Sequence, residues 1–268
     1  MLSEVIGTHC LIFDGAMGTE CLKKGLSYQE FSQSVMSHTE DIVNIHQSYL
    51  NAGANVLKTH TFSLSLDDLP EEEIHQLGIR ACGLVKGLHP DFWVYDMSPA
   101  PLGWDKEKRR QRYQTQAKVA LEEDCHQILL ETFYDLRELK YALNCVEEVA
   151  PAIDVIASIT NLEDLTVAEI EQFGNLVNRK QVIALGINCV SDFNQVKSFL
   201  ESFRQVSDFP VVISPNKGIP TKDDERLIYP VRDMEYLEGI AQIQKFSHVS
   251  IGGCCGTTPD MIYKITQI

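Results

Sequence analysis

Eight short apolar segments are distributed along the chain, and each is followed by a longer stretch in which apolar residues recur at helical spacing. The segments are continuous and rich in Val, Ile and Leu, which is typical of strands buried on both faces of a parallel sheet. These predicted strands are Cys10–Phe13, Asn55–Lys58, Phe92–Tyr95, Gln127–Leu130, Val155–Ala157, Val182–Leu185, Val211–Ile213 and Val249–Ile251. The stretches between them predict helices over Glu40–Ala52, Glu71–Leu88, Glu107–Glu123, Asp135–Glu148, Thr166–Val177, Ser191–Phe203, Met234–Phe246 and Pro259–Thr266.

Eight strand–helix units in 268 residues fit an α/β fold of the (β/α)₈ TIM-barrel type. A doubly wound open sheet is the competing architecture. It requires a glycine-rich phosphate loop after the first strand, and Asp14-Gly-Ala-Met-Gly18 has the wrong spacing. Because no linker, low-complexity segment or charge block divides the chain, we expect residues 1–268 to form a single domain.

The charge balance excludes several classes of partner. The chain has 23 Lys and Arg residues against 38 Asp and Glu residues, which gives a formal net charge of −15. Neither nucleic acid nor an anionic membrane is therefore an expected partner. No apolar run approaches the roughly 20 residues that span a bilayer. The first residues lack the basic region of a signal peptide, so we expect a cytoplasmic protein.

Three of the eight cysteines stand apart from the others. Cys189, Cys254 and Cys255 each follow an apolar segment and lie in glycine-rich or turn-like sequence. Four others lie in apolar or helical patterns, where cysteine is usually a small hydrophobic residue, and no role is assigned to Cys21; the four are Cys10, Cys82, Cys125 and Cys145.

In a TIM barrel the active site forms at the carboxyl ends of the strands. Reactive or polar side chains follow nearly every predicted strand: Asp14, Thr59-His60-Thr61, Asp96, Glu131-Thr132, Ser158, Asn188-Cys189, Ser214-Pro-Asn216 and Cys254-Cys255. The barrel can bring the three cysteines together, and three thiolates suit tetrahedral zinc with the fourth position open to substrate. Two alternatives remain open at this point: Cys254 and Cys255 form a redox pair, or all three cysteines pack beside glycines.

Several motifs resemble those of the homocysteine S-methyltransferase family. The stretches Gly252-Gly-Cys-Cys-Gly-Thr-Thr-Pro259 and Gly186-Ile-Asn-Cys189 are similar to its two zinc motifs. Four further matches occur in the family's order along the chain: Asp14–Glu20, Ile45–Ala54, Leu130–Thr132 and Ser214–Asn216. The family includes betaine-dependent and S-methylmethionine-dependent enzymes and the homocysteine module of cobalamin-dependent methionine synthase.

The resemblance implies a role for each matching residue. Cys189, Cys254 and Cys255 would bind Zn²⁺, and the homocysteine sulfur would take the open position as a thiolate. Glu131 and Asp14 would be catalytic and substrate-binding residues. Glu131 would hold the homocysteine ammonium group, and Asp14 would support the same amino-acid end. The remaining substrate-binding residues are the main-chain groups of Gly15, Ala16 and Met17, and Asn188, which would orient the metal site. A strand-end carboxylate, a turn carboxylate and a turn asparagine are the structural alternatives for Glu131, Asp14 and Asn188.

Three places depart from the family pattern. His60 stands where the family has Asn, and either contacts substrate or packs as a neutral core residue. The loop Asp96–Gly103 replaces a Gly-Pro turn, and the stretch between the second and third strands is abbreviated. Both regions lie where the methyl donor would bind, so the resemblance says least about the donor.

The leading hypothesis is a zinc-dependent methyltransferase that makes methionine from homocysteine. Because one barrel uses all 268 residues, we expect the donor to be a small molecule or a separate protein. The resemblance to the family favours S-methylmethionine or S-adenosylmethionine as the methyl donor. The alternative is a homocysteine-binding subunit of a split methionine synthase that accepts methyl from a separate corrinoid protein. A hypothesis from another class is a metal-free redox or binding-only protein that uses Cys254 and Cys255.

Overall fold

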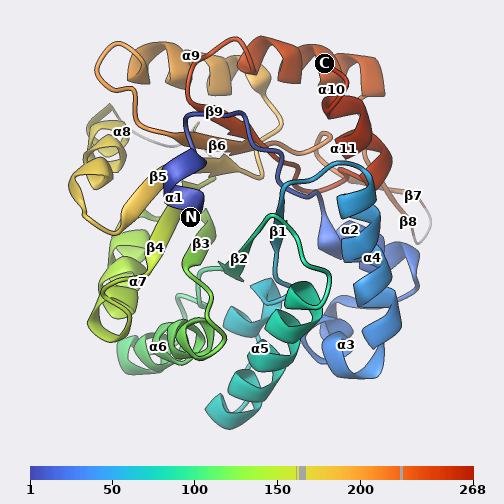
Figure 1. Cartoon of the computed structure of the whole chain (residues 1–268), viewed down its shortest axis with the longest axis vertical. Helices are drawn as coiled ribbons and strands as arrows, with labels where there is room; N and C mark the ends of the chain where they lie inside the picture. Colours follow the sequence, from blue (N-terminus) through green and yellow to red (C-terminus); the bar gives the residue numbers. More distant parts are fainter. Residues whose placement is uncertain (161, 163–166, 224–225) are drawn as a thin grey trace.

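A computed structural model describes residues 1–160, 162, 167–223 and 226–268. Its main sheet contains seven parallel strands that curl into a barrel, in the order β1-β2-β3-β4-β5-β6-β9 (Figure 1). Each of these strands coincides with a predicted apolar segment. They are β1 (Val56–Lys58), β2 (Phe92–Met97), β3 (Gln127–Phe133), β4 (Asp154–Ile159), β5 (Val182–Asn188), β6 (Val211–Ser214) and β9 (Val249–Ile251).

The eighth barrel position is filled by residues 11–13, which connect the two edge strands of the sheet. Ile12 forms a parallel bridge with Ile251 of β9, and Phe13 forms one with Val56 of β1. Phe13 N donates to Ile251 O across 2.7 Å, and Val56 N donates to Ile12 O across 3.1 Å. The predicted strand Cys10–Phe13 therefore lies in its expected place but makes isolated bridges instead of a continuous ladder. These bonds close the barrel, and the TIM-barrel prediction is confirmed.

Every predicted helix has a counterpart in the structure. They are α4 (Thr39–Asn51), α5 (Glu71–Lys86), α6 (Lys106–Glu122), α7 (Leu136–Val149), α8 (Val167–Gly174), α9 (Phe193–Phe203), α10 (Asp233–Ile243) and α11 (Pro259–Ile265). The predicted helix that contains α8 begins at Thr166, which lies outside the described residues, and continues as a 3₁₀ turn over Asn175–Asn178.

Several short elements were not predicted. They are α1 (Leu2–Val5), α2 (Met17–Lys23), α3 (Phe31–Ser37), two 3₁₀ turns (Tyr28–Glu30 and Phe62–Ser65) and the antiparallel pair β7 (Thr221–Asp223) and β8 (Arg226–Ile228). Helices of four to seven residues present too few turns for a periodic apolar pattern to be distinguished from loop sequence.

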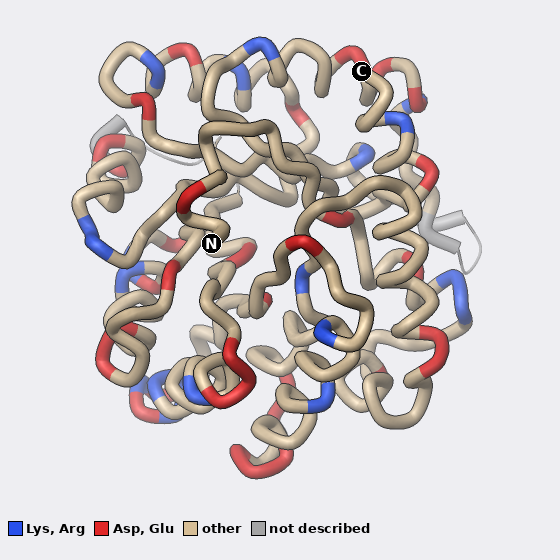
Figure 2. Tube along the Cα trace, viewed as in Figure 1, with Lys and Arg blue, Asp and Glu red and all other residues tan. Residues whose placement is uncertain are grey.

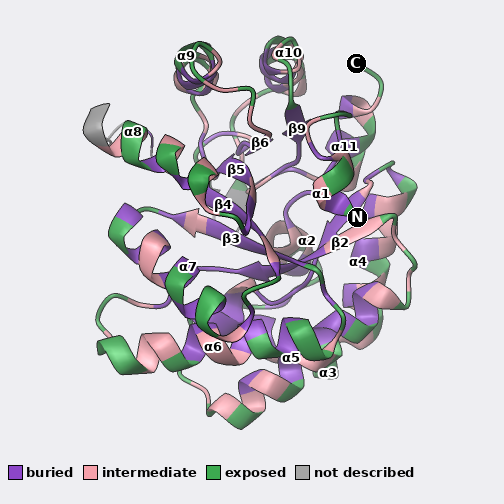
Figure 3. Cartoon of the chain, turned by 60° about the vertical axis from the view of Figure 1, so that its left-hand side comes forward, coloured by how far each residue is buried: buried purple, intermediate pink, exposed green. Residues whose placement is uncertain are grey.

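The core has two layers, and the smaller one fills the barrel interior. Leu2 and Ile6 at the N-terminus pack against inward-pointing strand residues such as Phe13, Val94 and Ile156. The short helix α1 therefore covers one end of the barrel. The larger layer lies between the sheet and the surrounding helices, and Figure 3 shows buried residues along the strands and on the helix faces turned toward them.

Charged residues lie mainly on the outer helices and loops (Figure 2). Within the described part of the chain, no helix combines the length and the apolar character needed to cross a membrane. A few charged side chains are nevertheless buried inside the barrel. They belong to the site described next.

Candidate zinc and substrate site

The structure brings the three predicted cysteines together at the carboxyl ends of the strands. Cys189 follows β5 directly, and Cys254 and Cys255 lie shortly after β9. Their three Sγ atoms lie within 4.8 Å of one another, and each residue is partly exposed. The ends of the sixth and eighth apolar segments thus converge as predicted. All three cysteines are free thiols, so no disulfide bond joins them.

Main-chain hydrogen bonds join the loops that carry these cysteines. Cys189 N donates to Ser214 O across 3.1 Å, Cys254 N donates to Pro215 O across 3.0 Å, and Lys217 N donates to Cys255 O across 2.9 Å. Cys189 itself has a left-handed backbone, with φ of 57°, a conformation that costs energy in a non-glycine residue. The end of β6 and the loop after it therefore fix both cysteine loops.

Two of the glycines that flank the cysteine pair are required by close packing. A Cβ atom on Gly253 would lie 2.3 Å from Thr257 Cγ2, and one on Gly256 would lie 2.4 Å from the ring of Tyr229. Gly256 also has φ of 81°, which strains any residue with a side chain. These contacts explain why glycines bracket Cys254 and Cys255.

Hydrogen bonds among the three thiols shift their pKa values in opposite directions. Hydrogen bonds from Cys254 and then Cys255 lower the pKa of Cys189 to about 3, with a further contribution from Asn216. The hydrogen bond to Cys189 correspondingly raises the pKa of Cys254 to about 11. The pKa of Cys255 is also raised, first by its hydrogen bond to Cys189 and then by the one to Cys254. A thiolate at Cys189 is thus stabilised by its neighbours.

The cysteine set fits a zinc ion. Zn–S bonds of about 2.3 Å in a tetrahedron place sulfur atoms about 3.8 Å apart, so only a small contraction of this cluster is required. Within the described ranges, the group of metal-binding side chains gathered here is limited to these three cysteines. Three protein ligands leave one tetrahedral position for another group, as in catalytic zinc sites.

Two asparagines hold the sulfur atoms. Asn216 Nδ2 donates to Cys189 Sγ across 3.4 Å. Asn188 Nδ2 lies 4.0 Å from Cys254 Sγ and donates to Thr132 Oγ1 across 2.6 Å. Asn188 Oδ1 accepts hydrogen bonds from Thr132 N and Ser158 Oγ, so this side chain ties β3 and β4 to β5. Asn188 therefore lies where an orienting residue would lie, whereas the contact of Asn216 was not predicted from its motif.

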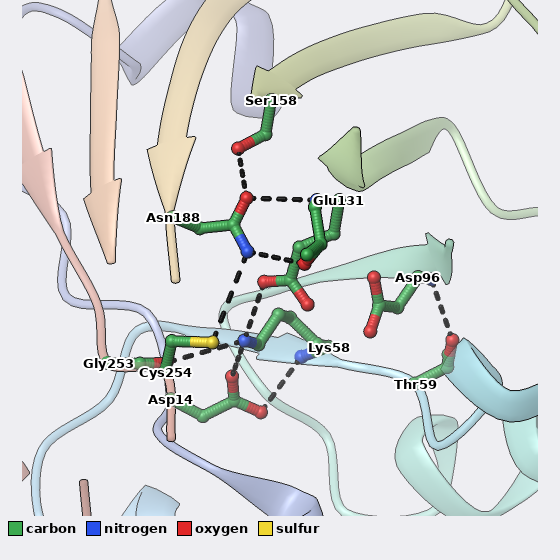
Figure 4. A network of polar contacts seen from close by, with 10 residues as sticks. Asp14, Lys58, Thr59, Asp96, Glu131, Ser158, Asn188, Gly253 and Cys254 are labelled. Atoms are coloured by element: carbon green, nitrogen blue, oxygen red, sulfur yellow. Dashed lines mark hydrogen bonds and ion pairs between the residues drawn. The ribbon is translucent and has the colours of Figure 1, made fainter. Parts of the chain in front are cut away.

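A cluster of buried charges lies beside the cysteines (Figure 4). Lys58, the last residue of β1, places its Nζ 3.0 Å from Glu131 Oε1, 3.8 Å from Asp14 Oδ1 and 3.5 Å from Gly253 O. Lys58 N also donates to Asp14 Oδ2 across 3.0 Å. The structure thus brings the predicted residues Asp14 and Glu131 together around Lys58, which was expected only as the last residue of a strand. The signal for it was a lysine at the end of a buried apolar run, where a charge is costly unless paired.

Burial and mutual repulsion shift the ionisation of this cluster. Burial raises the pKa of Asp14 to about 7, and it also raises the pKa of Glu131. Asp96, at the end of β2, has a pKa raised well above its usual range by burial and then by the charge of Glu131. Burial alone would lower the pKa of Lys58, but its carboxylate neighbours raise it well above its usual range. The neighbouring carboxylates therefore favour the charged form of Lys58.

The main-chain groups predicted to bind substrate lie next to Asp14. The Ala16 N–H already donates to Thr257 O across 2.9 Å, and α2 begins at Met17. A Cβ atom on Gly15 would lie 2.5 Å from Thr257 O. Gly15 therefore permits the close approach between this turn and the loop that carries the cysteine pair.

His60 packs in the core. Its ring centroid lies 6.0 Å from that of Phe31, and its Nε2 lies 3.0 Å from Ser34 Oγ. Burial lowers its pKa to about 4, so the ring is neutral near pH 7. Of the two alternatives for His60, the structure shows the packing residue.

The architecture and the site together define a (β/α)₈ barrel with a three-cysteine cluster at the carboxyl ends of its strands. The family model described as homocysteine S-methyltransferase matches residues 11–268, and the chain belongs to this family. The resemblance inferred from the motifs is confirmed.

Individual relatives agree with this assignment. The chain is 27% identical to the methionine synthase of Mycobacterium leprae and 26% identical to that of Mycobacterium tuberculosis, in each case over 98% of its length. It spans only 24% and 25% of those two proteins. Among solved structures, the metallated homocysteine methyltransferase MmuM from Escherichia coli has a TM-score of 0.78 at 20% identity, with 99% of both chains covered. The apo form of MmuM has a TM-score of 0.76 at 22% identity, with 96% of this chain and 95% of that chain covered. This likeness confirms the fold.

Proposed function

We propose that this chain is a zinc-dependent homocysteine S-methyltransferase that forms methionine. The observation that carries the proposal is the position of the three-cysteine cluster beside a buried acidic cluster, in a chain of this family. The first cluster suits a thiol-binding metal, and the second suits the ammonium group of an amino acid. A thiol amino acid matches both.

Cys189, Cys254 and Cys255 would hold the zinc ion. When bound, zinc lowers the pKa of a substrate thiol, so that the reactive thiolate forms near neutral pH. Asn216 donates to Cys189 and thereby fixes that sulfur. Asn188 joins the end of β3 to β5 through Thr132 and approaches Cys254, so it would hold the two cysteine loops in fixed positions.

The buried acidic cluster would bind the amino-acid end of homocysteine. Glu131 and Asp14 would supply the negative charge, together with main-chain groups of the turn that follows Asp14, from Gly15 through Ala16 to Met17. The substrate sulfur then forms a bond with the methyl carbon of the donor, and the bond between that carbon and the donor's heteroatom breaks with its electron pair leaving on the donor. The protein's contribution is to hold the sulfur and the amino-acid end in one orientation.

The donor that we favour is a small sulfonium compound, S-methylmethionine or S-adenosylmethionine. Similarity to the methionine synthases supports a second candidate, in which a separate corrinoid protein supplies the methyl group. The two candidates differ in what must be added to the purified chain before methionine appears.

A metal-free redox role for Cys254 and Cys255 is the competing class of function. Metal binding is favoured by the proximity of all three sulfur atoms and by the amide hydrogen bond to Cys189. A redox pair requires only two thiols, so it would not explain the position of Cys189.

A methyl-transfer assay tests the proposed activity. Zinc-loaded protein and homocysteine are incubated with S-methylmethionine, with S-adenosylmethionine, or with a methylated corrinoid protein, and methionine is quantified by mass spectrometry. Methionine in any of the three reactions, abolished by chelation of zinc, is the expected result. Activity that survives chelation, or no methionine with any of the three, would contradict the proposal.

A further inference from the structure

Gly253, the residue directly before Cys254, has both of its main-chain polar groups engaged by Asp14 and Lys58. Gly253 N donates to Asp14 O across 3.0 Å, and Lys58 Nζ donates to Gly253 O across 3.5 Å. Asp14 and Lys58 are themselves joined, because Lys58 N donates to Asp14 Oδ2 across 3.0 Å. The three residues therefore form a closed set of hydrogen bonds that ties the loop of the cysteine pair to β1.

Pairing with Glu131 does not account for every contact of the Lys58 ammonium group. An ammonium group has three donors, and its neighbours here are Glu131 Oε1 at 3.0 Å, Asp14 Oδ1 at 3.8 Å and Gly253 O at 3.5 Å. Lys58 is only 8% exposed, so its charge must be paired, and the carboxylates meet that need. The bond to Gly253 is additional, and Figure 4 shows it reaching the segment that carries Cys254.

The loop of the cysteine pair is thus held by two separate parts of the barrel. From the segment after β6, Pro215 O accepts from Cys254 N across 3.0 Å, and Lys217 N donates to Cys255 O across 2.9 Å. From β1, Lys58 holds the carbonyl group of the peptide bond between Gly253 and Cys254. Without the second anchor this peptide could rotate, and Cys254 Sγ would no longer be held near the other two sulfur atoms.

We propose that Lys58 is a positioning residue of the zinc site, which acts through Gly253 to hold Cys254 where a metal ion requires it. The inference rests on the proposed function, because it concerns the same zinc site. Hydrogen bonds from residues that do not touch the metal commonly orient its ligands, and loss of one typically costs about ten- to a hundred-fold in metal affinity. Lys58 thereby has a task besides the neutralisation of Glu131.

Zinc affinity in two backgrounds tests the inference. Competition with a chromophoric chelator gives the zinc Kd of the reduced wild type, Lys58→Met, Glu131→Gln and the double variant Lys58→Met/Glu131→Gln. Methionine is similar to lysine in length but has no donor. Lys58→Met should bind zinc about ten- to a hundred-fold more weakly than the wild type, and the double variant should be weakened by the same factor relative to Glu131→Gln. Lys118→Met, at an exposed lysine of α6, is the control and should bind zinc like the wild type.

The second background separates the anchor from the ion pair. Lys58→Met alone leaves the Glu131 carboxylate buried without its lysine, which destabilises the fold. Glu131→Gln removes that unpaired charge, so the double variant reports the loss of the bond to Gly253. Circular dichroism confirms that each variant is folded.

Cadmium-113 NMR of the cadmium-loaded proteins provides a readout at the metal itself. The chemical shift of bound cadmium depends on the number of thiolate ligands, and exchange of a ligand on and off the metal broadens the line. The wild type, Glu131→Gln and Lys118→Met should each give one sharp line. In the double variant the line should broaden or move to lower chemical shift, because Cys254 is bound for only part of the time.

Four results would overturn the inference. Equal zinc affinity in Lys58→Met and the wild type would show that the anchor has no effect on the site. A loss that disappears in the Glu131→Gln background would reduce Lys58 to the partner of Glu131. Weaker binding in both backgrounds with an unchanged cadmium line would indicate general loosening of the fold. A wild-type protein that binds no zinc would contradict the proposed function itself, and the inference would fall with it.

Discussion

Asn216 donates its side-chain amide to Cys189 Sγ across 3.4 Å, and it does so from the loop that also holds the backbone of Cys189 and Cys254. Asn216 therefore supports the Cys189 sulfur directly, and its neighbours Ser214, Pro215 and Lys217 bond to the backbones of all three cysteines. Outer hydrogen bonds of this type fix the orientation of metal ligands and tune their affinity.

Asn216→Ala should weaken zinc binding. Removal of a hydrogen bond to a metal ligand typically costs about ten- to a hundred-fold in affinity. Competition between the protein and a chromophoric chelator measures this change. Asn178→Ala, at an exposed asparagine, is the control and should bind zinc like the wild-type protein. Equal zinc affinity in Asn216→Ala and Asn178→Ala would show that the amide does not support the site.

A methyl group added at Gly253 should destabilise the protein. The Cβ atom would lie 2.3 Å from Thr257 Cγ2, so the loop that carries the cysteine pair would have to move. Such overpacking costs about 1–3 kcal/mol, and chemical denaturation of Gly253→Ala measures it. Gly83→Ala is a control of opposite sign, because this exposed site in α5 has no atom within 4 Å of an added Cβ. There the change should stabilise the helix by about 0.5–1 kcal/mol. A Gly253→Ala protein as stable as the wild type would contradict the packing described.

His60 should make the protein less stable as the pH falls. Burial lowers its pKa from 6.5 to about 4, so the folded protein keeps the ring neutral while the unfolded chain takes up a proton below pH 6.5. The cost, about 1.4 kcal/mol per pH unit, therefore appears between pH 6.5 and 4 and is absent above pH 6.5.

His60→Asn removes this proton uptake, and the difference between the two proteins isolates the effect. The free energy of unfolding of the wild-type protein should fall relative to that of the variant as the pH is lowered through this window. The raised carboxyl pKa values of Asp14 and Glu131 act in the opposite direction but are common to both proteins. A difference that stays constant from pH 7 to pH 4 would show that His60 titrates normally.

The sequence carries most of the information about the barrel, for a physical reason. Strands of a TIM barrel are buried on both faces, so runs such as Val182–Leu185 are recognisable from their apolar residues alone. The cysteine cluster follows from the same pattern, because the barrel places all strand ends on one face. Short elements such as α2 and the pair β7 and β8 depend on contacts made after folding and have no comparable pattern.

The charged cluster could be predicted only in part. Asp14 and Glu131 were identified through their motifs, but Lys58 was included in an apolar segment and its pairing with Glu131 depends on the distance between β1 and β3. Side-chain geometry across three strands determines which carboxylate oxygens accept hydrogen bonds. It also determines that Asp96 Oδ1 has no partner among the described residues. A linear sequence does not contain that distance information.

Zinc stoichiometry tests the central claim most directly. The protein is purified under reducing conditions without added metal, and zinc per chain is measured by plasma mass spectrometry for the wild type, Cys254→Ser and the exposed-site control Cys10→Ser. One zinc per chain in the wild type and in Cys10→Ser, and none in Cys254→Ser, is the predicted result. Folded, reduced wild-type protein that contains no zinc and binds none when it is supplied would contradict the account.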